Sequence, residues 1–250
     1  MRYAAATHVG RVRKVNQDRY LVREEADGVS VILVADGMGG HVAGEVASEL
    51  AVTTIRDTLV HNLQQIQYKA RLVEAISVAN SKIYKEAASN DLYAGMGTTI
   101  VAVLATAETL YVAHVGDSRA YLLAHGQTAL TRLTEDHSLV NELIRRGQIL
   151  PEEAATHPQR HMLTRALGTS PTVDIEFREW PWRPQDVLLV CSDGFNTHVS
   201  ETSIAAVLAD GRDLVEHVNV MLQLALDEGG HDNITIVVLV NDSSERGSGE

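Results

Sequence analysis

Short apolar runs of strand length recur along the chain between residues that favour turns. They are rich in Val, Ile, Leu and Tyr and are bounded by Gly, Asp, Asn or Ser, which is typical of β-strands. The first two runs are separated by "EEADGVS", whose Asp-Gly pair predicts a hairpin, and "LATAETLYV" predicts a second one. The predicted strands cover residues 19–22, 29–34, 99–104, 109–115, 120–123, 187–190 and 234–240.

Four other segments repeat apolar residues every three or four positions, as one face of an α-helix does. These predicted helices lie at residues 44–59, 69–88, 204–208 and 214–225, and "NELIRRGQI" predicts a further short one. The helices come in adjacent pairs and the strands in hairpins. This order favours antiparallel sheets over a doubly wound parallel sheet, so we predict an α+β fold.

The length of the chain leaves the number of domains open, and composition decides it. Hydrophobic residues make up 45% of the 250 positions, enough for a sizeable core, and no internal linker rich in Pro, Gly or Ser divides the chain. We therefore predict one domain over residues 1–241. The last stretch, "DSSERGSGE" at 242–250, predicts a disordered tail.

Charge and cysteine content exclude several classes of partner. The formal net charge is −12, which argues against nucleic acid or an anionic membrane as a partner. Cys191 is the single cysteine, so an intrachain disulfide is impossible and a reducing compartment is expected. The N-terminus lacks the apolar core of a secretory signal, and the longest apolar run, residues 236–240, is too short to span a bilayer. We expect a cytoplasmic protein.

Aspartates stand at the ends of the predicted strands. Asp36, Asp117 and Asp193 each follow a strand, whereas Asp18 and Asp232 each precede one. Any one of them alone could be a turn residue or a helix cap. Five carboxylates gathered together would repel one another, so the cluster indicates a bound cation.

The ligand types restrict the cation. The sequence has no Cys-x-x-Cys or His-x-x-x-His spacing of the kind that binds zinc, whereas carboxylates, a carbonyl and water suit Mg²⁺ or Mn²⁺. Two such ions about 3.5–4 Å apart can generate a hydroxide and clamp phosphoryl oxygens. Beside Asp36, Gly37 leaves its carbonyl free to reach a metal, and Gly39 and Gly40 permit a sharp turn into the next helix.

Other phosphate-handling motifs fail on inspection. A dinucleotide-binding loop that began at Gly37 would need a third glycine where Val42 stands, and no Walker-type Gly-Lys-Ser/Thr is present. A cysteine phosphatase would need an arginine six residues after its nucleophile, where this chain has Thr197. Cys191 is therefore interpreted as a small buried residue.

Eight ordered blocks resemble the metal-dependent protein serine/threonine phosphatases, the PPM or type 2C family, in a compact bacterial form. Together they extend from residue 10 to residue 240. The resemblance implies an α/β/β/α sandwich, with two central antiparallel sheets flanked by helix pairs. The matching stretches are "GRVRKVNQD", "VADGMGGHVAGE", "GMGTTIVAVL", "VAHVGDSRAYLL", "LTEDHSLVNELIRRGQI", "HMLTRALGT", "LLVCSDGF" and "GGHDNITIVVL".

The resemblance also implies a metal-binding role for each aspartate. Asp36 would bridge two tightly bound Mn²⁺ or Mg²⁺ ions, with the Gly37 carbonyl on one of them. Asp193 and Asp232 would ligate the other ion. Two further aspartates act outside the central pair: Asp18 would hold the water shell, and Asp117 would bind a weaker third ion.

Three further features complete the implied site. Arg13 matches the arginine that grips the substrate phosphate, chemistry that suits a bidentate guanidinium. Some relatives have a general-acid histidine two residues after the bridging aspartate, where this chain has Met38. His41 is the nearest replacement. Residues 138–163 correspond to the variable flap beside the active site.

The resulting hypothesis is a protein serine/threonine phosphatase that opposes a kinase in signalling. A hydroxide on the dinuclear centre would attack phosphorus directly in phosphorylated proteins, and we expect the enzyme to be a monomer. A catalytically silent phosphoprotein binder is the alternative from another class, and the intact set of aspartates with Arg13 argues against it. Hydrolysis of small phosphate esters stays open as a side activity.

Overall fold

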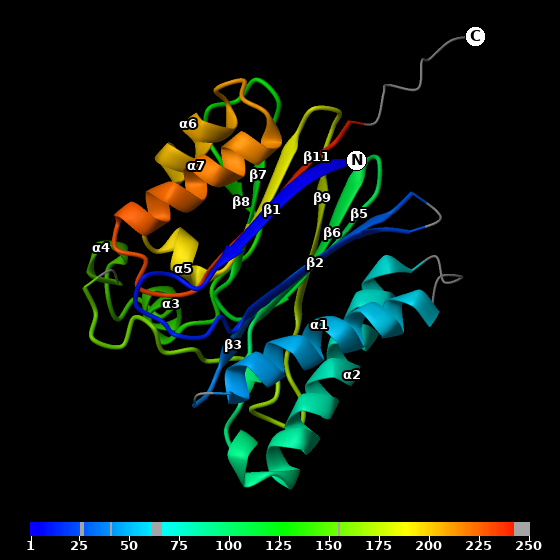
Figure 1. Ribbon diagram of the computed structural model, residues 1–250, viewed down its shortest axis with the longest axis vertical. Helices are drawn as coiled ribbons and strands as arrows, with labels where there is room; N and C mark the ends of the chain where they lie inside the picture. Colours follow the sequence, from blue (N-terminus) through cyan, green and yellow to red (C-terminus); the bar gives the residue numbers. More distant parts are fainter. Residues whose placement is uncertain (26–27, 41, 62–66, 155, 243–250) are drawn as a thin grey trace.

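The computed structural model is a sandwich of two antiparallel sheets between two pairs of helices, and it describes residues 1–25, 28–40, 42–61, 67–154 and 156–242 (Figure 1). The five-stranded sheet has the order β1 (Arg2–His8), β11 (Ile234–Val240), β10 (Val187–Cys191), β7 (Arg119–Leu123) and β8 (Thr131–Arg132). The six-stranded sheet has the order β2 (Asp18–Glu24), β3 (Ser30–Met38), β5 (Ile100–Ala105), β6 (Thr109–Val115) and β9 (Glu176–Pro181), and short β4 (Gly97–Thr98) pairs with β3.

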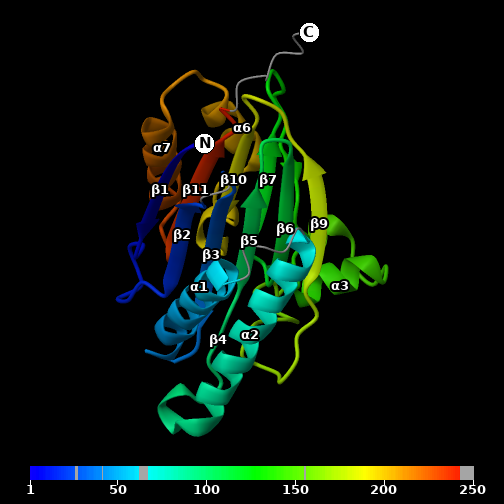
Figure 2. The same cartoon turned by 90° about the vertical axis from the view of Figure 1, so that its right-hand side faces the viewer.

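The helices cover the two outer faces of the sandwich (Figures 1 and 2). The long pair packs on the six-stranded sheet, and α6 and α7 pack on the five-stranded sheet. The long helices are α1 (Ala43–His61) and α2 (Tyr68–Ser89); the others are the 3₁₀ turn η1 (Asp91–Tyr93), α3 (Leu139–Arg145), α4 (Pro151–Ala154), α5 (Asp193–Asn196), α6 (Glu201–Leu208) and α7 (Leu214–Asp227).

Three layers of buried side chains explain why the central strands read as unbroken apolar runs. Along β3, Val31 and Leu33 pack toward α1 and α2, whereas Ile32 and Val34 pack between the sheets. Successive side chains of a strand point to opposite faces, so a strand covered on both sides needs apolar residues at every position. The predicted α+β sandwich of antiparallel sheets flanked by helix pairs is confirmed.

Antiparallel pairing brings the acidic ends of the strands to the same end of the sandwich. In the first predicted hairpin, Asp18 at the start of β2 lies opposite Asp36 near the end of β3. In the other sheet, the end of β10 pairs with the starts of β11 and β7. The second predicted hairpin, β5–β6, is also formed. All five aspartates therefore lie at or near strand ends that face the same region.

Three edge strands escaped the sequence analysis. β1 has the sequence RYAAATH, β9 has the sequence EFREWP, and β8 is only two residues long. Each pairs with a strand on one side only in its sheet. Edge strands are less buried and carry polar residues, so their apolar signal is weak. The helix predicted from "NELIRRGQI" is α3, which begins earlier because the Ser138 hydroxyl accepts a hydrogen bond from the Asn141 N–H.

Two sequence-based expectations fall partly or wholly outside the described residues. His41 is one, and the tail after Asp242 is the other. Within the described ranges, no helix is long and apolar enough to cross a membrane.

Candidate metal centre

The predicted carboxylates come together between the ends of the two sheets. The side chains of Asp36 and Asp193 are within hydrogen-bonding reach of each other. Asp18 is buried beside them, and its Oδ2 accepts a 2.7 Å hydrogen bond from the Ser192 hydroxyl. Asp36 and Asp193 remain partly exposed, so an ion can reach the cluster from solvent.

Burial and mutual repulsion raise the pKa values of these carboxyl groups. Burial is the main cause for Asp36, whose pKa lies well above its usual value, and the charges of Asp18, Asp193 and Asp117 add to it. Burial also raises the pKa of Asp18 to about 7 and that of Asp117 to about 8, with Asp193 contributing to both. The protein alone therefore disfavours the charged state of a cluster that a divalent cation would neutralise.

Two buried oxygens fit the expectation of a cation. Asp18 Oδ1 and Asp193 Oδ1 have no hydrogen-bond partner among the described residues. A buried, unpaired carboxylate oxygen is costly, and ligation of a metal is one way to satisfy it. Because the donors are carboxylates, the residues present suit a hard cation such as Mg²⁺ or Mn²⁺.

The glycines after Asp36 allow the start of α1 to approach the end of β3. A Cβ on Gly37 would collide with the Gly44 carbonyl, so this position has room only for glycine. Gly39 has a φ of +136°, a conformation that favours glycine, as the predicted sharp turn requires. Gly40 does not adopt a positive φ, and a Cβ there would meet open space. The predicted turn therefore requires glycine at Gly39 but not at Gly40.

Threonines hold the backbone of Asp36, and the sequence analysis missed them. The Thr98 hydroxyl donates to the Asp36 carbonyl at 2.9 Å, and the Asp36 N–H donates to Thr99 Oγ1 at 3.0 Å. Thr99 Oγ1 also lies 2.8 Å from Ser118 Oγ, next to Asp117. The Thr99 hydroxyl thus links the backbone of Asp36 to the Asp117 loop.

Arg13 lies on the loop that leads into Asp18. Its Nη2 is 2.8 Å from Asp232 Oδ2, and its side chain is 52% exposed. The guanidinium therefore stands at the rim of the carboxylate cluster and remains accessible from solvent. The structure thus brings Arg13 next to Asp232, one of the aspartates that the sequence analysis singled out.

Asn233 braces the Arg13 loop. Its Nδ2 donates to the carbonyls of Val9 and Val15 at 2.9 and 3.0 Å, and its Oδ1 accepts from the Gln17 N–H at 2.8 Å. The side chain is buried, so these bonds are shielded from water. The sequence shows only an asparagine between Asp232 and an apolar run, and its bracing role follows from the tertiary structure.

We expect Asn233→Asp to destabilise the protein, because a carboxylate oxygen would replace the Nδ2 donor between two carbonyls. The loss should be roughly 1–3 kcal/mol or more in the free energy of unfolding, measured by urea denaturation. Asn90→Asp is the matched control. The Asn90 Oδ1 accepts from the Leu92 N–H, a bond that aspartate keeps. Equal stability of the two variants would contradict the bracing role.

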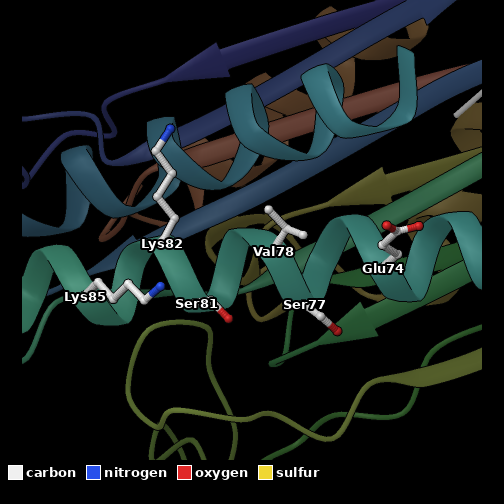
Figure 3. A pocket seen from close by; sticks show the side chains of 6 residues that line it. All are labelled: Glu74, Ser77, Val78, Ser81, Lys82 and Lys85. Carbon is white, nitrogen blue, oxygen red and sulfur yellow. The ribbon is translucent and has the colours of Figure 1, made fainter. Parts of the chain in front are cut away.

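A surface hollow of about 420 Å³ lies away from these residues. It runs along α2, as Figure 3 shows, and its lining side chains all come from that one helix: Glu74, Ser77, Val78, Ser81, Lys82 and Lys85. None of them is a predicted site residue. The hollow therefore does not compete with the carboxylate cluster as the centre of chemistry.

Comparisons with known proteins show the family of the chain. Residues 7–235 match the family described as protein phosphatase 2C. Serine/threonine phosphatase stp of Listeria monocytogenes serovar 1/2a is 40% identical over 246 residues, with 96% of each chain covered. Serine/threonine protein phosphatase PstP of Mycobacterium tuberculosis H37Rv is 38% identical over 239 residues, which is 95% of this chain and 44% of that protein.

Solved structures show the same fold. A crystal structure of a bacterial serine phosphatase has a TM-score of 0.90 at 33% identity and covers 98% of this chain and 99% of that one. The catalytic domain of PstP, solved in complex with two manganese ions, has a TM-score of 0.83 at 36% identity, with 95% and 96% covered. The chain belongs to the protein phosphatase 2C family and is a metal-dependent phosphoprotein phosphatase.

Proposed function

We propose that the protein removes phosphate from phosphoserine and phosphothreonine in proteins, with two Mn²⁺ or Mg²⁺ ions held by Asp36, Asp193 and Asp232. The observation that carries the proposal is the buried carboxylate cluster, in which oxygens of Asp18 and Asp193 have no partner among the described residues. The serine/threonine phosphatase names of the relatives support the substrate class. The manganese complex of PstP supports the metal.

Each residue of the cluster has a separate task. Asp36 would hold both ions, the Gly37 carbonyl would hold one of them, and Asp193 and Asp232 would hold the other. Asp18, which accepts a hydrogen bond from Ser192, would hold the water shell. When bound, the ions would supply a nucleophilic hydroxide at neutral pH and neutralise charge on the phosphoryl oxygens.

Direct attack on phosphorus is favoured because nearby side chains are poor nucleophiles. Burial raises the pKa of the Cys191 thiol to about 12, so it stays protonated. The Ser192 hydroxyl donates its hydrogen to Asp18 rather than facing a substrate. We therefore propose hydrolysis without a phosphoenzyme. His41 stays our predicted general acid, at a position outside the described residues.

Arg13 is proposed to bind the substrate phosphate. We expect Arg13→Ala to lower kcat/KM toward a phosphopeptide by about ten- to a hundredfold, chiefly by raising KM, because one charge-assisted hydrogen bond is lost. Arg11→Ala is the matched control. Arg11 pairs with Asp227 and is 56% exposed, so its loss removes equal charge without touching the cluster. If kcat/KM were unchanged in both variants, Arg13 would be an ordinary surface residue that does not bind the substrate phosphate.

Further features extend the proposal. Asp117 is assigned a third, weaker ion. Residues 1–241 are taken as one catalytic domain, with residues 138–163 as the flap beside the active site. In this flap, Arg145 pairs with Glu135 and Arg146 pairs with Glu142, and both arginines are exposed. We propose that the enzyme acts as a monomer opposite a serine/threonine kinase.

The deciding experiment measures phosphate release from a phosphothreonine peptide by the purified protein with Mn²⁺. Parallel assays use p-nitrophenyl phosphate at the same concentration. We expect turnover of both, with the peptide giving the higher kcat/KM. Peptide binding without phosphate release would instead indicate a catalytically silent phosphoprotein binder. Turnover of the small ester alone would mean that phosphorylated proteins are not the substrates.

A further inference from the structure

A second group of titratable side chains lies outside the aspartate cluster. The potential ligand atoms of His114, His137 and Glu176 all lie within 4.8 Å of one another, which invites interpretation as a metal site. His114 on β6 is the cross-strand partner of Glu176 on β9, and His137 approaches from the loop before α3. The two histidines are buried.

The arrangement of the rings excludes a shared ion. The imidazoles of His114 and His137 stack, with centroids 4.7 Å apart and planes 12° apart. A metal ligated by imidazole lies in the plane of the ring, about 2.0–2.1 Å from its nitrogen. Two stacked, nearly parallel planes cannot both contain one ion at that distance. The group must therefore have another use.

His137 holds both backbone groups of Gly116. The Gly116 N–H donates to His137 Nδ1 at 3.1 Å, and the His137 N–H donates to the Gly116 carbonyl at 2.9 Å. Because an amide N–H can only donate, Nδ1 carries no proton, and the neutral ring has its proton on Nε2. Nε2 faces Glu176 Oε2 at 3.5 Å, the outer limit of a hydrogen bond.

Its surroundings favour this neutral tautomer. The pKa of His137 is lowered to about 4, mainly by burial and also by His114 and Arg165, whereas Glu176 acts in the opposite direction. The carboxylate of Glu176 is itself held by Arg178, whose Nη2 lies 2.8 Å from Oε1. A chain of contacts thus leads from Arg178 through Glu176 and His137 to the backbone of Gly116.

The Gly116 backbone carries Asp117, whose carboxylate needs to be held in place. Gly116 has a φ of +111°, and a Cβ there would collide with Thr99, so the loop has an unusual and crowded course. A backbone held in such a conformation needs contacts from neighbouring segments to keep it in place.

A second contact fastens the same two segments. Arg119 makes a bidentate ion pair with Asp136, at 3.0 and 2.7 Å, directly before His137. His114 Nε2 also bonds to the Glu135 carbonyl at 2.8 Å. Residues 135–137 are thus attached to both sides of Asp117, and His137 is the attachment closest to it in sequence.

We propose that His137, held in its Nε2–H tautomer by Glu176, is a positioning residue that fixes the Asp117 loop through both backbone groups of Gly116. The inference rests on the proposed function in one respect, the role of Asp117 toward a third ion. Outer contacts of metal ligands set how well a site is formed before the metal arrives, and their loss costs about 10- to 100-fold in affinity or activity.

Two substitutions separate the two ring nitrogens. His137→Asn keeps an acceptor at the position of Nδ1 and loses the contact with Glu176. His137→Gln keeps a donor at the position of Nε2 and loses the acceptor for the Gly116 N–H. The matched control is His217→Gln. His217 is another buried histidine; it lies on α7, and its Nε2 bonds to the Asp210 carboxylate. Asp117→Ala shows the effect of losing the carboxylate itself.

Two readouts are made on metal-free protein and do not require catalysis. Nitrogen-15 NMR of the imidazole should show an unprotonated Nδ1 and a protonated Nε2 for His137. Hydrogen exchange of the Gly116 amide should be about tenfold faster in His137→Gln than in the wild type or in His137→Asn, because one hydrogen bond is lost. Protonation at Nδ1, or equal exchange in all three proteins, would overturn the proposal.

The third readout is the Mn²⁺ concentration that gives half-maximal phosphopeptide turnover. We expect it to rise about 10- to 100-fold in His137→Gln, toward the behaviour of Asp117→Ala, and to change only a few-fold in His137→Asn and His217→Gln. Equal Mn²⁺ requirements in His137→Asn and His137→Gln would overturn the positioning role. A wild type without any phosphatase activity would instead refute the proposed function, and the metal-free readouts would still decide the role of His137.

Discussion

Asp36→Asn is expected to abolish phosphopeptide turnover while the protein stays folded. Asp36 is the proposed bridge between the ions, and an amide can neither bridge them nor balance their charge. The loss should exceed about 100-fold in kcat, since even outer contacts of a metal site are worth about 10- to 100-fold. The pKa of Asp36 is raised by burial and by three neighbouring aspartates, so the neutral side chain should not destabilise the metal-free protein.

Asp186→Asn is the matched control, because the same substitution there should have the opposite pattern. The buried Asp186 carboxylate accepts hydrogen bonds from the N–H groups of His125 and Arg183, both at 2.7 Å. We expect Asp186→Asn to lower the melting temperature and to keep its kcat. An Asp36→Asn enzyme with a large fraction of the wild-type kcat would contradict the bridging role.

Removal of Mn²⁺ and Mg²⁺ is expected to abolish turnover and to leave a fold whose stability falls as pH rises. Burial raises the pKa of Asp18 from 3.8 to about 7 in the folded protein. Between these values the folded, metal-free protein binds a proton that the unfolded chain has already lost. Its stability is therefore highest at the acidic end and decreases up to about pH 7, and Asp117, with a pKa of about 8, extends the window.

The contribution of Asp18 to this pH-dependent loss of stability can be measured by comparison with Asp18→Asn. A shift from 3.8 to about 7 corresponds to a penalty on the order of 4 kcal/mol for Asp18 once it is charged. Asp18→Asn lacks this penalty, so in chelator its melting temperature should exceed that of the wild type by several degrees more at pH 8 than at pH 5. Added Mn²⁺ should stabilise the wild type more at pH 8, because ions and protons compete for the same oxygens.

Three results would contradict this account. Turnover that survives exhaustive chelation would mean that the reaction does not require a metal ion. A metal-free wild type that gains stability toward pH 8 relative to Asp18→Asn would mean that Asp18 is held charged by the protein alone. Equal stabilisation by Mn²⁺ at both pH values would mean that the ions do not bind to the titrating carboxylates.

Much of the fold could be predicted because its central strands are covered on both faces. β3, β5 and β11 are apolar at almost every position, a pattern that few other structures produce. The edge strands β1 and β9 were missed for the same physical reason. Their partial exposure allows alanine, arginine and glutamate, so local composition no longer separates a strand from a loop.

The carboxylates of the site could also be predicted, but their supports could not. An aspartate that ends an apolar strand is conspicuous in any sequence. Ser192 is an ordinary residue until it is seen to donate to Asp18, which lies 174 positions earlier. Thr99, which accepts from the Asp36 N–H, gives equally little local signal, because its role depends on which strand lies beside it.

The sequence by itself therefore determined which side chains are candidates for the chemistry, since charge, ligand type and strand position are local properties. Tertiary structure alone decided how these side chains meet: that Asp18 stands opposite Asp36, that Asn233 braces the Arg13 loop, and that His137 holds Gly116. The physical reason is that strand register and the closure of two sheets depend on how whole apolar faces pack. No short segment of sequence encodes that packing.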